Sequence, residues 1–241
     1  MISVVTTAYN HQNTLQRAID SVQSQIGVEY EHIIIDDTKT HNGMMRTYQM
    51  ALKKCTGDYI AFCDGDDYWI DEYKLARQLR YMEKNPDCGL CITLVYTEKN
   101  GIRLLMPDAD FVNANMSFDA LLKGNAYINA QSYLIRKSDF DKYIDFDYFV
   151  KNFNTWDYPI VLELIKHARI HCLNFYSAVY TVNEESVTNT RDRKRRIKYL
   201  IGNYKIKWYY IRKYGCKFST KLYLIYKILR NIYSVGAKRW T

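Results

Sequence analysis

Residues 57–69 read GDYIAFCDGDDYW, and this stretch decides the fold. The apolar run at 59–62 predicts a short buried strand, and the acids Asp64, Asp66 and Asp67 follow it directly. In open α/β sheets, ligands bind beyond the carboxyl ends of the strands. The stretch therefore predicts a strand that delivers carboxylates to a binding edge.

The rest of the first hundred residues alternates between strand and helix patterns. Short β-rich apolar runs lie at 2–7 and 33–35, and apolar residues recur at helical spacing within 15–26, 44–54 and 75–82. Strands that alternate with helices in this way predict an α/β fold, with a largely parallel sheet that helices cover on both faces.

The remainder of the chain continues the same domain with a less regular pattern. We expect a hairpin of 91–97 and 102–106 around Asn100-Gly101, a helix at 117–123, a strand at 127–135, a helix at 156–167 that opens at Asp157, a strand at 169–182 and two amphipathic helices from about 191. The organisation is thus one domain with two halves, 1–97 and 98–190, followed by a basic helical tail at 191–241.

Charge is distributed unevenly along the chain. Residues 191–241 contain 16 Lys and Arg against one acid, Asp192, which gives +15; because the whole chain carries +8, the body carries −7. A strongly basic, amphipathic tail favours a phosphate-rich partner such as an anionic membrane surface. The alternative is that the tail packs on the acidic body. Nucleic acid is not expected, because no binding motif for it occurs.

Several classes of protein are excluded or disfavoured. No run of about 18 apolar residues occurs, so a spanning helix is not expected, and the N-terminus reads as a strand rather than a signal peptide. The six cysteines are scattered, and we interpret the lone pair Cys88 and Cys91 as reduced structural thiols in the cytosol. Neither GxGxxG nor a P-loop is present.

Acidic residues end two of the predicted strands, Asp36-Asp37 after one and Asp64, Asp66 and Asp67 after the other. If the strands are neighbours, these carboxylates gather at one edge and repel each other unless a cation compensates. Hard carboxylate oxygens suit Mg²⁺ or Mn²⁺, and these ions also bridge to substrate phosphates. A metal would replace the missing glycine-rich phosphate cradle.

These motifs, in their order and spacing, resemble family 2 of the glycosyltransferases, which has the GT-A fold. The resemblance implies a nucleotide-sugar-binding half at 1–97 and an acceptor-binding half at 98–190. It is carried by 3–10 (SVVTTAYN), 35–37 (IDD), 57–69, Lys74-Leu75, Asn85-Pro86, 156–159 (WDYP) and 185–187 (ESV).

The resemblance assigns the donor nucleotide to the ends of the first two strands. Thr7, Ala8 and Tyr9 would contact the base, with Tyr9 stacking on it. Asp36, with Asp37, would accept hydrogen bonds from the base or ribose. The alternative for the two acids is a turn at the end of a strand, and for Tyr9 it is core packing.

The resemblance also assigns the metal and the catalytic base. Asp64, Asp66 and Asp67 stand at the family's DxD motif. Asp66 would contact the ribose or the metal, and Asp67 would ligate the metal that bridges the diphosphate. Asp157 stands where the family keeps its general base, although Trp156 replaces the usual preceding acid or glycine. The alternative is that Asp157 only caps its helix.

The acceptor is expected over the middle of the chain. The segment with Gln131 and Ser132 resembles one near the family's acceptor pocket. Trp156 is a candidate sugar platform, with core packing as the alternative. The five histidines show no ligand spacing and receive no role.

Together the motifs predict an inverting transfer from a nucleoside-diphosphate sugar, with a UDP-sugar expected from the family, to a glycan or lipid-linked hydroxyl. The expected setting is bacterial cell-surface polysaccharide synthesis in the cytoplasm, with peripheral contact at the inner face of the membrane. Two alternatives stay open. One is a non-catalytic nucleotide-sugar-binding scaffold, favoured only by the change at Trp156, and the other is a sugar nucleotidyltransferase.

Overall fold

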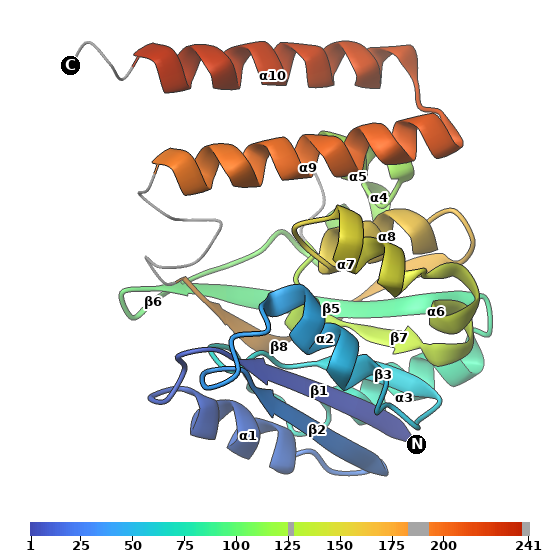
Figure 1. Ribbon diagram of the computed structural model, residues 1–241. Helices are drawn as coiled ribbons and strands as arrows, with labels where there is room; N and C mark the ends of the chain where they lie inside the picture. Colours follow the sequence, from blue (N-terminus) through green and yellow to red (C-terminus); the bar gives the residue numbers. More distant parts are fainter. Residues whose placement is uncertain (125–127, 183–192, 238–241) are drawn as a thin grey trace.

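A computed structural model describes residues 1–124, 128–182 and 193–237. These residues form one curled, eight-stranded sheet flanked by helices (Figure 1). The strand order is β2-β1-β3-β7-β5-β8-β4, and β6 pairs with β5. The strands are β1 (Ile2–Ala8), β2 (Tyr30–Asp36), β3 (Tyr59–Phe62), β4 (Tyr68–Trp69), β5 (Cys88–Lys99), β6 (Ile102–Leu104), β7 (Leu134–Arg136) and β8 (Arg169–Thr181).

Helices follow most of the strands and cover both faces of the sheet (Figure 1). They are α1 (Leu15–Gln23), α2 (Met44–Leu52), α3 (Lys74–Lys84), α4 (Ala109–Ala114), α5 (Phe118–Lys123), the short 3₁₀ helix η1 (Ala130–Ser132), α6 (Lys137–Tyr143), α7 (Phe146–Asn152), α8 (Asp157–Leu164), α9 (Arg193–Tyr214) and α10 (Phe218–Ala237).

The three N-terminal strands pair in parallel, with β1 between β2 and β3. Ala8 lies opposite Asp36, and Val5 lies opposite Phe62, so the acidic ends of β2 and β3 meet at one edge. Strands β5 and β8 are also parallel, whereas β7 runs antiparallel to both of its neighbours. The α/β fold predicted from the alternation of strands and helices is confirmed.

The core forms two clusters, one on each face of the sheet. Val5 and Ile60 face the cluster under α2, α8 and α9, whereas their neighbours Val4 and Ala61 face the cluster under α1 and α3. This alternation is the two-residue period of a strand, and it explains why the central strand β3 is apolar and buried along its whole length. Cys88 and Cys91 are buried free thiols in β5.

Most elements expected from the sequence are present, including the hairpin of β5 and β6. The strand expected at 127–135 is wrong over most of its length. Residues 130–132 form a 3₁₀ turn, closed by a bond from the Ser132 amide to the Asn129 carbonyl (3.0 Å), and only Leu134–Arg136 extends. Tyr127 lies outside the described residues. The helix expected to reach 167 ends at Leu164.

The basic tail forms the two helices that the sequence predicts, and they pack on the body as two outer layers (Figure 1). Ile206 and Tyr210 of α9 are fully buried in the core, and Lys213 forms an ion pair of 2.8 Å with the buried Glu163 of α8. The tail is therefore part of the folded unit. Among the described helices, none combines the length and apolarity needed to cross a membrane.

Candidate functional site

The acidic loop after β3 is fixed tightly against the end of β1. The Gly65 amide donates to the Thr7 carbonyl (2.9 Å), and the Asp67 amide donates to the Asp64 carbonyl (3.0 Å). A Cβ added at Gly65 would meet the Ala8 Cβ at 3.0 Å and the Thr7 carbonyl at 3.3 Å. Any side chain here would force Ala8 or the loop to move by a few tenths of an ångström, so glycine favours this close approach, which holds the acids at the carboxyl edge of the sheet.

Asp64 is held by two hydroxyl groups. Tyr48 of α2 and Thr7 both donate to its Oδ1, the latter at 3.3 Å. Burial, the charge of Asp66 and, to a smaller extent, the charge of Asp157 together raise the pKa of Asp64 to about 7, against the lowering effect of these hydrogen bonds. The site therefore confines negative charge, and a nearby cation would stabilise the carboxylate.

Asp67 is only 4% exposed and accepts a hydrogen bond from the Thr181 amide at 2.9 Å. Burial and the neighbouring acids Asp66 and Asp64 raise its pKa well above its usual range, although Arg17 lowers it. The backbone of β8, which is more than a hundred residues away in the sequence, thus orients the Asp67 carboxylate.

Asp66 lies between the other two acids and does not line the cavity described below. Its carbonyl accepts a bond of 3.3 Å from Arg17, whose guanidinium also stacks over the Tyr68 ring at 4.0 Å.

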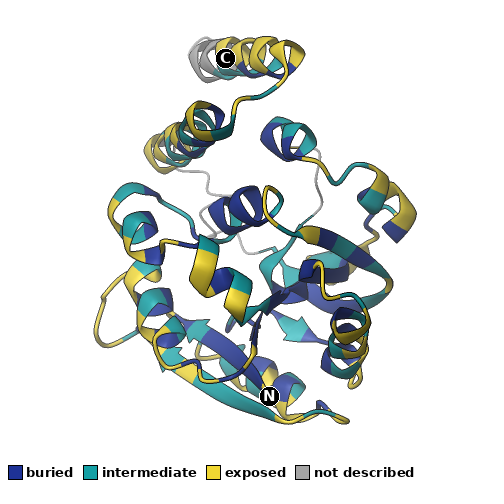
Figure 2. Ribbon diagram, turned by 90° about the vertical axis from the view of Figure 1, so that its right-hand side faces the viewer, coloured by how far each residue is buried: buried dark blue, intermediate teal, exposed yellow. Residues whose placement is uncertain are grey.

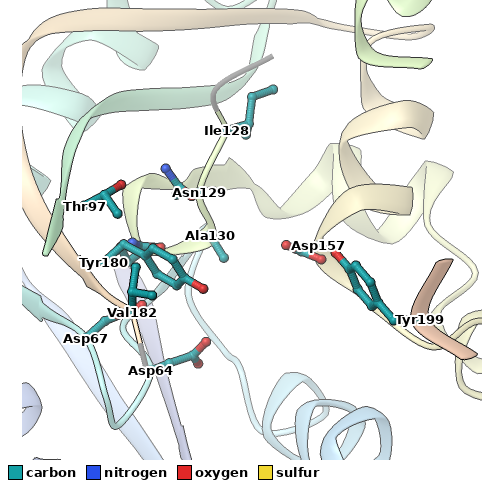
Figure 3. A pocket seen from close by; sticks show the side chains of 11 residues that line it. Asp64, Asp67, Thr97, Ile128, Asn129, Ala130, Asp157, Tyr180, Val182 and Tyr199 are labelled. Carbon is teal, nitrogen blue, oxygen red and sulfur yellow. The ribbon is translucent and has the colours of Figure 1, made fainter. Parts of the chain in front are cut away.

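A cavity of about 490 Å³ opens beside these acids (Figure 3). Asp64 and Asp67 line one side, and Asp157 points into it from the other side. The remaining lining residues are Thr97, Ile128, Asn129, Ala130, Gln131, Tyr180, Val182 and Tyr199. The fold thus brings two of the three expected metal ligands, Asp64 and Asp67, and the expected base to one space, whereas Asp66 does not line it.

Asp157 begins α8, but it does not cap the helix. The N-cap residue is Trp156, which makes no side-chain cap bond, and the Asp157 carboxylate instead accepts a short hydrogen bond from Thr155. The alternative of capping alone does not match this geometry. Tyr199 of α9, which sequence reasoning missed, faces the cavity beside Asp157 (Figure 3).

Gln131 is 3% exposed and lines the cavity, and its side-chain Nε2 has no hydrogen-bond partner among the residues that the structure describes. Its carbonyl accepts a bond of 3.0 Å from the Trp69 indole, so the backbone of η1 is fixed. A buried amide without a partner is costly unless a ligand satisfies it. Gln131 is therefore placed to donate to a ligand in the cavity.

Two residues expected near the acceptor are instead buried in the core. Trp156 is 3% exposed and packs on Tyr48 and Phe62, with ring centroids 4.2 and 4.5 Å away. Ser132 is 1% exposed, and its hydroxyl donates to the Asn129 carbonyl. The acceptor contacts expected of Trp156 and Ser132 do not fit this burial.

The end of β1 offers an exposed aromatic ring. Tyr9 is 48% exposed and meets His41 edge-to-face, with centroids 5.6 Å apart. Ala8 is buried, and its carbonyl accepts a bond of 2.8 Å from the Asp37 amide. Tyr9 is thus accessible to a flat ligand, as stacking on a base requires.

Asp36 and Asp37 have different environments although they are adjacent. Asp36 is exposed, and bonds from the Thr38 hydroxyl and amide lower its pKa. Asp37 is 2% exposed; its burial would raise its pKa, but hydrogen bonds from residues 40–43 lower it to about 2. Because both Asp37 oxygens are bonded within this loop, the nucleotide contact expected of Asp37 does not fit.

The metal-binding capacity of the site comes from few protein groups. Among the described residues, no three His, Cys, Asp or Glu side chains are grouped to hold an ion. Mg²⁺ commonly takes only one or two carboxylates and completes its shell with water and substrate phosphates. Asp64 and Asp67, side by side on one wall, fit that mode of binding.

The family model for glycosyl transferase family 2 matches residues 3–42 and 38–144, more than half of the chain. The chain belongs to glycosyltransferase family 2. This confirms the family that the sequence predicts. Residues 185–187, which also contributed to the predicted resemblance, lie outside the residues that the structure describes.

Similar bacterial proteins include a named glucosyltransferase and proteins that have not been characterised. The chain is 27% identical over 216 residues to the Escherichia coli UDP-Glc:alpha-D-GlcNAc-diphosphoundecaprenol beta-1,3-glucosyltransferase WfaP, covering 78% of this chain and 80% of that protein. It also matches uncharacterised mycobacterial proteins at 26% identity, and there the chain spans about half (47%) of the length of the relative.

Solved structures confirm the GT-A-like fold. Staphylococcus aureus TarS 1–349 in complex with UDP-GlcNAc aligns with a TM-score of 0.58 at 15% identity, over 77% of this chain and 59% of TarS. The Pyrobaculum calidifontis mannosyltransferase PcManGT, in complex with GDP-Man and Mn²⁺, aligns with a TM-score of 0.58 at 14% identity, over 84% and 62% of the two chains.

Proposed function

We propose that this family 2 glycosyltransferase transfers a sugar from a nucleoside-diphosphate donor, a UDP-sugar, to an acceptor hydroxyl with inversion of configuration. The observation that carries the proposal is the cavity of about 490 Å³, with Asp64 and Asp67 on one side and Asp157 on the other. The candidate metal ligands Asp64 and Asp67 and the candidate general base Asp157 are thus separated by a space that a sugar can occupy.

In this proposal the acidic side of the cavity binds the donor diphosphate. Asp67 and Asp64 would hold Mn²⁺ or Mg²⁺ together with the phosphates, and Asp66 would contact the ribose or the metal. The bound ion would supply positive charge against the charge that develops on the leaving diphosphate. Thr181 and Tyr48 would orient the two carboxylates through their hydrogen bonds.

Asp157 would act as the general base toward the acceptor hydroxyl, a role that typically contributes a factor of about 10²–10⁴. Thr155 fixes the orientation of the carboxylate. Among the described residues that line the cavity, Asp157 is the single carboxylate on the side opposite Asp64 and Asp67, which favours one direct displacement and therefore inversion. In the proposal Gln131 donates from its unpartnered Nε2 to a hydroxyl of the sugar in the cavity.

The nucleoside would occupy the exposed end of β1. Tyr9 would stack on the base, Thr7 and Ala8 would line the base pocket through their backbone, and Asp36 would accept from the base or ribose. The exposure of Tyr9 and Asp36 supports these roles.

For the acceptor we propose a lipid-linked glycan in bacterial polysaccharide synthesis at the cytoplasmic face of the membrane. WfaP supports this class, because its name describes a UDP-Glc donor and a diphosphoundecaprenol-linked acceptor. The similarity to TarS and PcManGT, which were solved with nucleotide sugars, supports a nucleotide-sugar donor.

The test is calorimetric titration of UDP, GDP and dTDP, each with and without Mn²⁺. We expect one nucleotide, UDP, to bind in a metal-dependent way, and Asp67→Ala to abolish the metal dependence. The matched control is Asp20→Ala, because Asp20 is an exposed acid on α1 whose carboxylate accepts a hydrogen bond from Gln16 in the same helix. Absence of binding by every nucleotide would refute the donor site.

A non-catalytic scaffold is the alternative that this test leaves open. Asp157→Asn separates the two, because a scaffold would bind donor with unchanged affinity and show no turnover in either form. For an enzyme, the same variant should bind donor normally and lose about 10²–10⁴-fold in kcat.

A further inference from the structure

The outermost helix of the molecule, α10, is exposed along much of its length (Figure 2), and its exposed residues include an apolar stripe. The spacing of its members, three to four residues along the helix, places them on one face. They are Phe218 (74% exposed), Leu222 (51%), Ile225 (45%), Tyr226 (58%) and Leu229 (61%).

The opposite face of α10 already holds the helix on the body. Leu224 is 1% exposed in the core, and the Thr220 hydroxyl donates to Asp119 of α5 at 2.6 Å. Asn231 donates to the Tyr204 hydroxyl of α9 at 3.1 Å. The stripe is therefore not the packing surface of α10, and so many large exposed apolar side chains on one face mark an interaction surface.

Positive charge surrounds the stripe. Residues 193–231 contain thirteen Lys and Arg and no acid. Lys217, Lys221 and Arg230 are exposed beside the stripe, and Lys205 and Arg212 are exposed on α9. A second copy of this chain would bring an equally cationic helix pair, so charge opposes pairing of two stripes.

We propose that the stripe docks on an anionic lipid surface, with α10 lying in the interface plane. An exposed apolar face with flanking cations is the combination that binds such surfaces, because apolar burial adds to attraction by lipid headgroups. The inference deepens the proposed function, since it would bring the cavity to the surface that holds a lipid-linked acceptor.

The test is co-sedimentation of the full chain with two kinds of vesicle, phosphatidylcholine alone and phosphatidylcholine with about one third phosphatidylglycerol. We expect binding to the anionic vesicles, and a loss of about tenfold or more in the variant Leu222→Ser/Leu229→Ser. The control is Ile102→Ser/Leu105→Ser, which removes two equally exposed apolar side chains near β6 and should leave binding unchanged.

A charge variant tests the second half of the proposal. Lys221→Gln/Arg230→Gln should weaken anionic binding about tenfold or more and reduce its salt dependence. Equal binding by the stripe variant and the wild type would overturn the proposal. So would a wild-type dimer in sedimentation equilibrium that Leu222→Ser/Leu229→Ser dissociates, because a second copy would then occupy the stripe.

Nucleotide titration of the same proteins keeps the two proposals apart. Vesicle binding without nucleotide binding would refute the proposed function but would support the proposal that the α10 stripe docks on a membrane. Metal-dependent nucleotide binding without vesicle binding would support the proposed donor site and refute membrane docking by the stripe.

Discussion

The hydroxyl of Tyr48 donates to the carboxylate of Asp64, although the two residues come from different elements. The ring of Tyr48 packs at the same time on Trp156, the residue before Asp157, with centroids 4.2 Å apart. One buried aromatic side chain therefore connects the two sides of the cavity. The change to Trp156 that distinguishes this chain from the family pattern fits this packing.

Tyr48→Phe should keep the ring packing and remove the hydrogen bond to Asp64. Because a buried carboxylate loses a partner, we expect the free energy of unfolding to fall by about 1–3 kcal/mol, and kcat/KM to fall about tenfold. Urea unfolding and donor kinetics measure the two effects. Tyr73→Phe, on a half-exposed tyrosine, is the control; equal behaviour of the two variants would contradict the role of Tyr48.

Gln131→Met should separate function from stability. It removes an amide nitrogen that finds no hydrogen-bond partner within 1–124, 128–182 and 193–237, so stability should stay equal or rise. If Nε2 binds the sugar, affinity for the donor sugar should fall by about tenfold, with UDP affinity unchanged. Calorimetry of UDP-sugar against UDP checks this.

Gln78→Met provides the opposite comparison. Its Nε2 donates to the carbonyls of Cys91 and Ser132, both at 2.8 Å, so this variant should lose about 1–3 kcal/mol of stability. If Gln131→Met lost as much, a purely structural role for Gln131 would be indicated.

Gly65→Ala should displace the acidic loop. The added Cβ would lie 3.0 Å from the Ala8 Cβ, so the loop or β1 must move by several tenths of an ångström. Since small misplacements in an active site are expensive, we expect metal-dependent UDP binding to weaken by about tenfold or more. Gly101→Ala, at a turn with open space around it, should leave UDP binding unchanged even if φ strain lowers stability.

His32 should make stability depend on pH. Burial lowers its pKa from 6.5 to about 4, so the folded protein keeps the imidazole neutral where the unfolded chain protonates it. Stability from this group is complete above pH 6.5 and is lost as the pH falls toward 4. With allowance for partial exposure, the loss should be about 1–3 kcal/mol.

Urea unfolding of the wild type and His32→Gln at pH 7 and pH 4.5 isolates this effect from the carboxylates, which titrate in both. The wild type should lose more stability between the two conditions than the variant. An equal loss would contradict the assignment to His32, whose ring bonds to Thr6 at 2.8 Å.

The sequence predicted the elements that depend on strong periodicity and the acids that end the strands. It could not predict that Asp36 and Asp37 have different environments, because both are acids at the end of the same strand. In the fold, the Asp36 side chain is exposed to solvent, whereas the Asp37 side chain is buried in the loop that follows. Residues 130–132 were expected as strand because apolar and small residues fit both a strand and a tight turn. Tyr48 carried no signal, since a tyrosine on an amphipathic helix reads as core.

The tail could be predicted as helical and basic but not as a wall of the cavity. Contacts such as Tyr199 with the cavity and Lys213 with Glu163 join positions far apart in the sequence, and no local pattern encodes them. Contacts between such distant residues form only when the chain folds into its tertiary structure.

Helix α9 lies between α10 and the cavity, and it contributes to both. Its Tyr199 borders the space for the substrate, while its Ile206 and Tyr210 fasten the outer layer to the core. Under the two proposals, membrane anchoring and acceptor choice are therefore not independently adjustable traits. A lineage that reshapes this helix to suit a different surface would also alter which acceptor fits.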